Sequence, residues 1–118
     1  MMIAPCRWIA GVEATDLFSI GALRITPFAS LLLETATIAI VIHRHACGQW
    51  CYPDGLLSTD EEEVNERSLV LIQRGARTGE LRSRYRVSTR QGNTVDIALI
   101  TTAGGADPCT WICLWQER

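Results

Sequence analysis

The chain lacks an apolar run long enough to cross a membrane. Its most apolar stretch, residues 27–42, is interrupted by Glu34 and falls short of the roughly 20 apolar residues that a spanning helix needs. The first residues also lack a basic segment followed by a long apolar one, so no secretory signal is predicted. We therefore interpret residues 27–42 as buried core and expect no membrane partner.

A strong charge imbalance is also absent. Eleven lysine and arginine residues stand against 13 aspartate and glutamate residues, which leaves a net charge of −2. This balance does not by itself indicate a nucleic-acid or membrane-surface protein. Hydrophobic residues make up 47% and charged residues 20%, as is typical of a globular chain and not of a disordered one. We expect a single domain over residues 1–118, with residues 1–15 as a flexible N-terminal flap.

The five cysteines are an odd number, so they cannot all pair with one another. Together with the missing secretory signal, this favours reduced thiols and a cytoplasmic location.

Helix signals lie in the first two thirds of the chain. Thr26 followed by Pro27 is a typical helix start, because threonine can cap unpaired amides and proline suits the first helical position. Residues 35–42 are ambiguous, since their β-branched density favours a strand and their continuation into His43 is compatible with a helix.

The clearest helix is expected to end near Arg74. It begins with a capping box at Thr59 and Glu62, and acidic residues in its first turn complement the helix dipole. Gly75 is its expected C-terminal stop.

The last third predicts a β-meander. Residues 81–89 alternate apolar or small with polar side chains, and residues 90–93 are a hairpin turn. Residues 95–101 form the next strand, and residues 110–115 form a third that is apolar on both faces and so is expected to be covered on both. With a short strand near residues 23–25, the predicted fold is α+β, with helices packed on one face of a small three- to four-stranded antiparallel sheet.

Several short motifs follow one another in order along residues 20–118. They are Arg44-His45, Gly48-x-Trp50, Asn65 on the acidic helix, Gly75, Leu81-x-Ser83-x-Tyr85, Gly92, residues 97–101, Thr110-x-Ile112-x-Leu114 and Glu117. This order resembles a family of small "plasmid-related" proteins of plasmids and integrative elements, which typically show Arg-His-x-x-Gly-Asp-Trp-Gly early in the chain. Gln49 stands where that family has aspartate, and Cys51 where it has glycine. The resemblance implies mobile DNA as the setting, and it favours the helix for residues 35–42.

An arginine face is predicted on the first strand of the meander. Arg82, Arg84 and Arg86 recur at every second position, so they lie roughly 6.6–6.8 Å apart on one face. This spacing is on the scale of successive phosphates in an extended single strand, and guanidinium groups bind phosphate or carboxylate bidentately. The alternative is a solvated face whose charges discourage aggregation of sheet edges. Three more arginines extend the surface on the binding interpretation: Arg74, Arg77 and Arg90.

Histidine and cysteine side chains gather within nine residues, at His43, His45, Cys47 and Cys51. Zinc prefers such ligands, but the pairs Cys47/Cys51 and Cys109/Cys113 enclose three residues each, whereas strong zinc motifs enclose two. A cysteine thiolate beside a histidine base would instead make a thiol enzyme. The alternative to both is that the cysteines are small buried hydrophobes and that His45 holds the turn by a hydrogen bond.

The tryptophans Trp50, Trp111 and Trp115 are expected in the core or, if they are exposed, at an interface. Trp111 and Trp115 share a parity on the last strand. If they lie at the surface, they predict a homodimer through the meander.

We therefore expect a non-enzymatic binding protein, an accessory factor of a mobile genetic element, with no cofactor. It would occupy an acidic protein surface or nucleic acid with the arginine strand and with the loop from His45 to Trp50. Interference with a host defence or nucleic-acid complex is the most concrete version. The alternative is a small metal- or thiol-dependent enzyme that uses zinc or a thiolate at His43, His45, Cys47 and Cys51.

Overall fold

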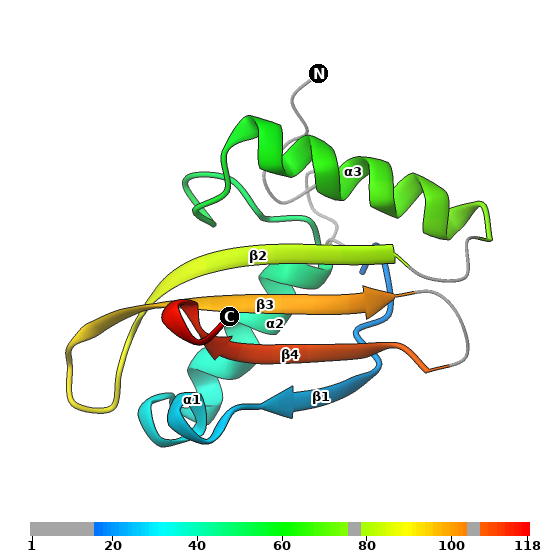
Figure 1. Ribbon diagram of the computed structural model, residues 1–118. Coiled ribbons are helices and arrows are strands. Elements are labelled where there is room, and N and C mark those ends of the chain that lie inside the picture. The colour runs from blue at the N-terminus through cyan, green and yellow to red at the C-terminus, as the bar shows by residue number, and fades with distance from the viewer. Residues whose placement is uncertain (1–15, 76–78, 104–106) are drawn as a thin grey trace, which may run out of the picture.

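The computed structural model describes residues 16–75, 79–103 and 107–118, which form one four-stranded sheet with helices beside it (Figure 1). The predicted α+β class is confirmed. The flap predicted over residues 1–15 lies outside the described residues. Across the sheet, the strands are β1 (Ala22–Ile25), β4 (Cys109–Leu114), β3 (Thr94–Ala103) and β2 (Gly79–Ser88).

The sheet is mixed, so the prediction of a purely antiparallel sheet was wrong. β2, β3 and β4 form the expected antiparallel meander, but β1 pairs with β4 in parallel, with Ile25 opposite Ile112. The three α-helices of the described residues lie between β1 and the meander along the sequence, so no hairpin determines the direction of β1. Gly21 allows the close approach of the two strands, because a Cβ atom there would lie 1.9 Å from the carbonyl oxygen of Pro108.

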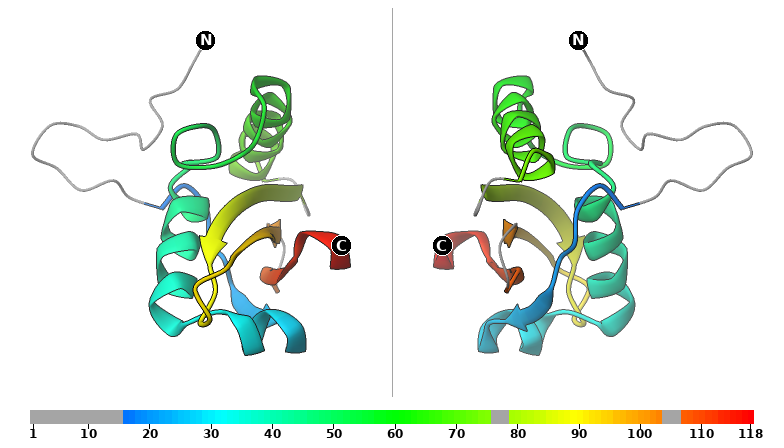
Figure 2. Two further views of the ribbon diagram at one scale, coloured as in Figure 1. Left: turned by 90° about the vertical axis from the view of Figure 1, so that its left-hand side faces the viewer. Right: turned by 90° about the vertical axis from the view of Figure 1, so that its right-hand side faces the viewer.

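Helices α1 (Pro27–Leu32) and α2 (Thr35–Ala46) follow β1, and α2 lies across one face of the sheet (Figure 2). The predicted start of α1 is confirmed, since the side chain of Thr26 accepts a hydrogen bond from the amide of Ala29 at 3.4 Å. Residues 35–42 are helical, so the helix is confirmed over the strand. Their β-branched side chains are accommodated because Val41 packs into the core.

Helix α3 (Thr59–Gln73) lies beside the edge strand β2. Its capping box uses Ser58 and Glu61, one residue earlier than predicted. The side chain of Asn65 imitates a neighbouring strand, because its Nδ2 donates to the carbonyl of Arg82 at 2.6 Å and its Oδ1 accepts from the amide of Arg82 at 3.0 Å. The edge of β2 is thereby partly closed to another strand.

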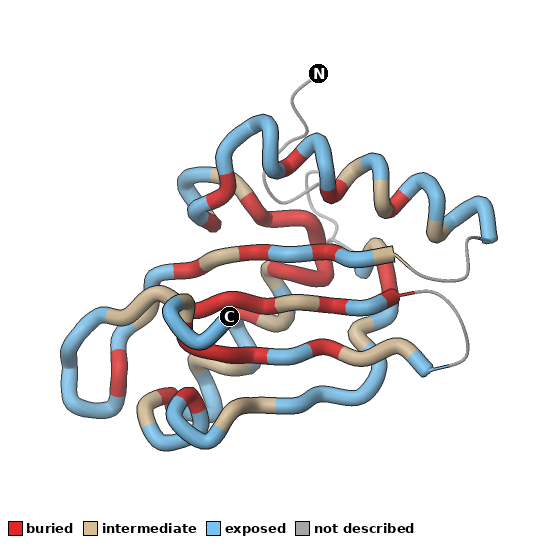
Figure 3. Tube along the Cα trace, viewed as in Figure 1, coloured by how far each residue is buried: buried red, intermediate tan, exposed pale blue. Residues whose placement is uncertain are grey.

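The core lies between the sheet and α2, where alternate residues of the strands point inward. We call this side the covered face. Figure 3 shows buried segments along the three strands of the meander. The strand residues of the covered face that are fully or almost fully buried are Leu81, Ser83, Tyr85, Ile97, Leu99, Thr101, Ala103, Thr110, Ile112 and Leu114.

The opposite face of the sheet has no α-helix over it within the described residues (Figure 2). The short 3-10 helix η1 (Trp115–Glu117) shields one end, and Cys113 there is buried. Trp111 is 46% exposed, so the prediction that the last strand is covered on both faces was wrong. The described residues also contain no helix that is both long enough and apolar enough to pass through a bilayer.

Candidate functional site

Strand β2 presents its arginines on the uncovered side of the sheet. Arg82 lies opposite Ile100, Arg84 opposite Ala98 and Arg86 opposite Asp96. All eleven basic residues of the chain are arginines, so every cationic side chain of this surface is a planar guanidinium. The predicted spacing on one face is confirmed by the strand register.

Asp96 holds two of these arginines in place. Its carboxylate accepts from Arg84 at 2.5 and 3.1 Å and from Arg86 at 2.8 and 3.2 Å. The hydrogen bond from Arg86, with further help from Arg84, holds the pKa of Asp96 below its usual value. Arg82 pairs with Glu80. The arginines are thus orientated by their acidic neighbours, and the side chains of Arg82 and Arg86 remain more than half exposed.

Two tryptophans lie among the arginines. The ring of Trp115 is contacted by the guanidinium carbon of Arg84 at 4.1 Å and by that of Arg118 at 3.3 Å from its centroid. Arg24 lies 5.8 Å from the ring centroid of Trp111. These are cation–π contacts, which hold both ring and cation at the surface. We call the following set the open face: Arg24, Arg82, Arg84, Arg86, Trp111, Trp115 and Arg118.

The sequence analysis missed Arg24 and Arg118. No local pattern connects them with β2. The parallel register places Arg24 opposite Trp111, and η1 brings the C-terminal Arg118 onto Trp115. The only available signal was the shared parity of Trp111 and Trp115, which both reach this side of the sheet.

A hollow of about 520 Å³ lies where the open face meets the start of α3. This volume is within the range of small-ligand pockets. Guanidinium groups and an indole ring line it, together with one carboxylate. The lining residues are Leu57, Glu61, Arg82, Ser83, Ala98, Ile100, Trp115 and Arg118.

Of the other predicted arginines, Arg74 and Arg90 lie beyond the ends of α3 and β2. Arg90 follows the end of β2 in the hairpin, where its amide donates to the carbonyl of Leu32 at 2.9 Å, so strand parity no longer places its side chain. Arg74 is the C-cap of α3. Arg77 lies outside the described residues.

His45, predicted as a binding residue and a metal ligand, is fully buried. Its ring packs edge-to-face on Phe18, with 5.2 Å between centroids. Both ring nitrogens already have partners, Ser83 Oγ at 2.5 Å and Thr101 Oγ1 at 2.8 Å. The prediction that His45 contacts a partner was therefore wrong, and the interpretation of His45 as a structural hydrogen-bonding residue is nearer to the structure.

The hydrogen bonds around His45 run in one direction. The hydroxyl of Thr110 donates to the carbonyl of Ile20 at 2.8 Å, so its oxygen accepts from the hydroxyl of Thr101 at 2.6 Å. The oxygen of Thr101 then accepts from Nε2–H of His45, and Nδ1 of His45 accepts from the hydroxyl of Ser83. Burial lowers the pKa of His45 from 6.5 to about 3, so the ring is neutral at physiological pH.

Trp50 was predicted as a binding residue and is also inside, at 1% exposure, with its indole N–H donating to the carbonyl of His45 at 2.9 Å. Tyr85 is buried too, and its hydroxyl donates to the carbonyl of Gln49 at 3.0 Å. The expected binding loop from His45 to Trp50 is therefore part of the core. Most polar side chains of the motifs quoted above are buried and make hydrogen bonds within the protein.

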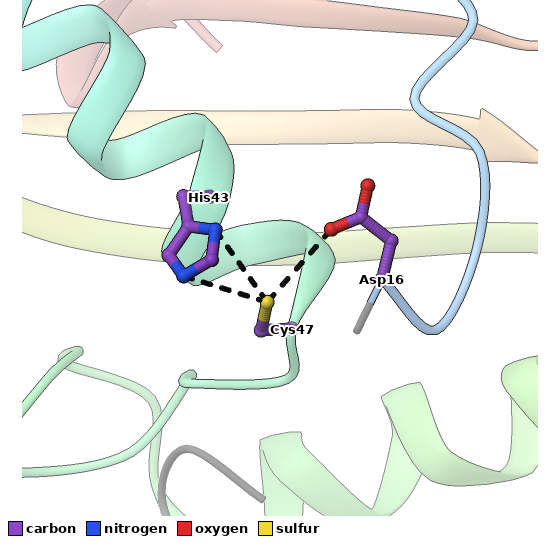
Figure 4. A group of neighbouring side chains, drawn as sticks. All are labelled: Asp16, His43 and Cys47. Atoms are coloured by element: carbon purple, nitrogen blue, oxygen red, sulfur yellow. Dashed lines mark hydrogen bonds between the residues drawn. The ribbon is translucent and has the colours of Figure 1, made fainter. Parts of the chain in front are cut away.

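The four predicted zinc ligands do not come together at one place. His43 and Cys47 approach one another, and they are joined by Asp16, which the sequence analysis missed (Figure 4). His45 and Cys51 lie elsewhere. Burial, and next the neighbouring Glu62, raise the pKa of Cys51 to about 12, which keeps it a thiol at neutral pH.

The second cysteine pair, Cys109 and Cys113, lies on β4 with one parity, as predicted. Burial raises the pKa of Cys113. Within the residues that the structure describes, this pair does not belong to a group of three potential metal ligands.

Comparison with known proteins found no family model, no curated protein and no solved structure that matches this chain.

Proposed function

We propose that this protein is a non-enzymatic binding protein whose open face takes single-stranded nucleic acid. One observation carries the proposal: among the described residues no α-helix covers one face of the sheet (Figure 2), and that face presents arginine and tryptophan side chains. Proteins that bind single strands without strong sequence preference combine cationic groups for the phosphates with aromatic rings for the bases.

Phosphates fit the arginine row. Arg82, Arg84 and Arg86 repeat at every second strand position, roughly 6.6–6.8 Å apart, which suits an extended backbone. Arg86 uses Nε and Nη2 for Asp96, which leaves donors of its Nη1 group for a partner. Because Asp96 already orders Arg84 and Arg86, these side chains lose less conformational entropy when a phosphate binds than unrestrained arginines would.

The bases fit the tryptophans. Trp111 is almost half exposed, and base stacking on an aromatic ring contributes about 1–3 kcal/mol per base. Trp115 forms a wall of the 520 Å³ hollow, with Arg82 and Arg118 beside it. A planar base with its phosphate matches this combination of indole and guanidinium groups.

The charge of the open face is locally positive although the chain is acidic overall. Its five arginines are accompanied by the carboxylates of Glu80 and Asp96 and by Glu61 from the first turn of α3, which lines the hollow. Because exposed charges are screened beyond roughly 10 Å at 0.1 M salt, a nucleic acid responds to the local face more than to the net charge of −2.

The biological setting in this proposal comes from the resemblance to the plasmid-related family. We place the protein in the cytoplasm as an accessory factor of a mobile genetic element. In this setting, we propose that the protein interferes with a host defence or nucleic-acid complex by binding its single-stranded nucleic acid.

The test is fluorescence anisotropy of labelled single-stranded DNA and RNA oligonucleotides over a series of salt concentrations. For a single strand, the plot of log K against log salt concentration falls with a slope of about 0.7 per phosphate contact, so each contact that is removed makes the slope about 0.7 less steep. We expect the double variant Arg82→Gln with Arg86→Gln to bind more weakly and to lower the slope by about 1.4. Trp111→Ala should weaken binding and leave the slope unchanged, because it removes stacking and no charge.

The matched control is the double variant Arg67→Gln with Arg74→Gln, which makes the same charge change on α3. It should bind as the unmodified protein does. An equal loss in the control, or no oligonucleotide binding at low salt, contradicts the proposal. Binding of polyglutamate with no binding of oligonucleotides would favour an acidic protein partner instead. The homodimer through this face stays a prediction, and native mass spectrometry of the same samples measures it.

A further inference from the structure

A carboxylate, an imidazole and a thiol meet beside the C-terminus of α2 (Figure 4). The sulfur of Cys47 lies 3.8 Å from Oδ1 of Asp16 and 3.7 Å from Nδ1 of His43. One ligand atom from each residue lies within 4.8 Å of the others. We propose that Asp16, His43 and Cys47 form a zinc site with one coordination position left for water or an incoming ligand.

The backbone holds two of these residues in register. His43 and Cys47 are four positions apart at the end of α2, and the amide of Cys47 donates to the carbonyl of His43 at 3.0 Å. Residues with this spacing lie on the same side of a helix. The imidazole and the thiol are therefore brought together by local structure.

Asp16 belongs to a segment that is distant from α2 in the sequence. The residue that follows Asp16 is hydrogen-bonded to α2. The amide of Leu17 donates to the carbonyl of Ala46 at 2.8 Å. Phe18 is buried and packs against the ring of His45. The position of the carboxylate is thus determined by tertiary contacts, and it does not depend on a metal.

The spacing of the three groups suits a tetrahedral ion. In a tetrahedral site, bond lengths to zinc of about 2.3 Å for sulfur, about 2.0–2.1 Å for nitrogen and about 2.0–2.2 Å for oxygen place the sulfur roughly 3.5–3.7 Å from a nitrogen or oxygen ligand. The observed separations from Cys47 Sγ, 3.7 to 3.8 Å, are close to this value. Both ring nitrogens of His43 lie at such a distance from the sulfur, so either one is near enough to be the ligand.

The ligand chemistry selects the metal. Thiolate and imidazole suit zinc, whereas calcium and magnesium require oxygen ligands. When zinc binds, the Cys47 thiol releases its proton to solvent and the sulfur forms a bond to the metal. The thiolate and the Asp16 carboxylate then balance the two positive charges of the ion, which suits a sulfur that is fully buried.

The site is independent of the proposed nucleic-acid function. It lies beside α2, whereas the open face is on the other side of the sheet (Figure 2). Three protein ligands with a fourth position open are the arrangement of catalytic zinc sites, in which the metal lowers the pKa of a bound water. The ligand class expected at that position is water or a small anion.

The experiment is zinc titration of the full chain after removal of metals, read by competition with a chromophoric indicator. We expect one zinc per chain. Cys47→Ser and Asp16→Asn should each weaken binding by at least about tenfold, since even residues that only support zinc ligands are worth roughly 10–100-fold. Cys51→Ser is the matched control and should bind zinc as the unmodified protein does.

Cobalt substitution gives a second readout. Cobalt bound to the unmodified chain and to Cys51→Ser should show a thiolate-to-metal charge-transfer band, which Cys47→Ser should lack. Asp16 is exposed, so Asp16→Asn keeps the test valid even if Cys47→Ser does not fold. Binding below one zinc per chain, zinc affinity unchanged in Asp16→Asn, or loss of the band in Cys51→Ser in place of Cys47→Ser would overturn the proposal.

Discussion

The two faces of the sheet are built from alternate residues of the same strands, yet they satisfy their polar groups in different ways. On the covered face, Ser83, Thr101 and Thr110 join with His45 in a chain of neutral hydrogen bonds. On the open face, the arginines pair with carboxylates and stack on tryptophans. Burial accounts for the difference, because a buried charge is costly to desolvate and a neutral hydrogen-bonded group is much less so.

The comparison shows that a polar motif need not mark a surface site. His45 and Trp50 attract attention in the sequence, but both lie in the core. His45 joins α2 to the meander through Ser83 and Thr101, and Trp50 packs in a buried cluster with Leu81 and Ala103. The surface with the chemistry for a partner is the less conspicuous alternation in β2, completed by residues from β1 and the C-terminus. The predictions below test whether stability depends on one face and binding on the other.

The largest expected effect is on the free energy of unfolding when one core side chain is truncated. Leu99→Ala should lower it by about 2–5 kcal/mol, because Leu99 is fully buried and a cavity remains. Ile100→Ala is the matched variant on the same strand, with its side chain on the open side, and it should cost clearly less. Urea denaturation measures both. Similar losses in the two variants would contradict the division between the faces.

A second effect is on the pH dependence of stability. The folded pKa of His45, about 3, lies below the ordinary value of 6.5, so the unfolded chain binds more protons between these values. Its contribution to stability is complete above pH 6.5 and falls towards pH 3, by up to about 1.4 kcal/mol per pH unit. His45→Gln keeps a donor and an acceptor but cannot be protonated. The urea midpoint is measured from pH 4 to pH 7 for the unmodified protein and for His45→Gln, and the difference between the two curves gives the contribution of His45. Parallel curves would show that His45 does not take up a proton on unfolding.

The smallest effect is expected on the open face. Arg82→Gln with Arg86→Gln should leave the free energy of unfolding nearly unchanged, because ion pairs this exposed contribute little. The same double variant is expected to lose nucleic-acid affinity, so stability and binding separate. A loss of several kcal/mol in urea denaturation would instead make the arginine pairs part of the scaffold.

Elements with local signals could be predicted from the sequence. Helix α3, its stop at Gly75 and the hairpin between β2 and β3 follow from capping, glycine and alternation. The capping box was misplaced by one residue because Ser58-x-x-Glu61 and Thr59-x-x-Glu62 are equally good local patterns. In the structure Glu62 is buried, and the capping box is the earlier pair, Ser58 with Glu61.

The candidate sites were only partly predictable. His43 and Cys47 share a helix end, so their proximity is local, whereas Asp16 reaches them through contacts of Leu17 and Phe18 that no sequence pattern announces. His45 lies only two positions from His43 but turns into the core, because neighbouring helix positions face different sides. Sequence proximity therefore grouped ligands that the helix separates.

By itself, the sequence determined the class of most elements and the alternation of β2, because hydrophobic periodicity and capping act over a few residues. Only the tertiary structure decided that β1 runs parallel to β4, that Arg24 and Arg118 complete the open face, and that Asp16 joins His43 and Cys47. These outcomes depend on contacts between segments far apart in the chain. Their geometry is set by packing of the whole core, which no local pattern specifies.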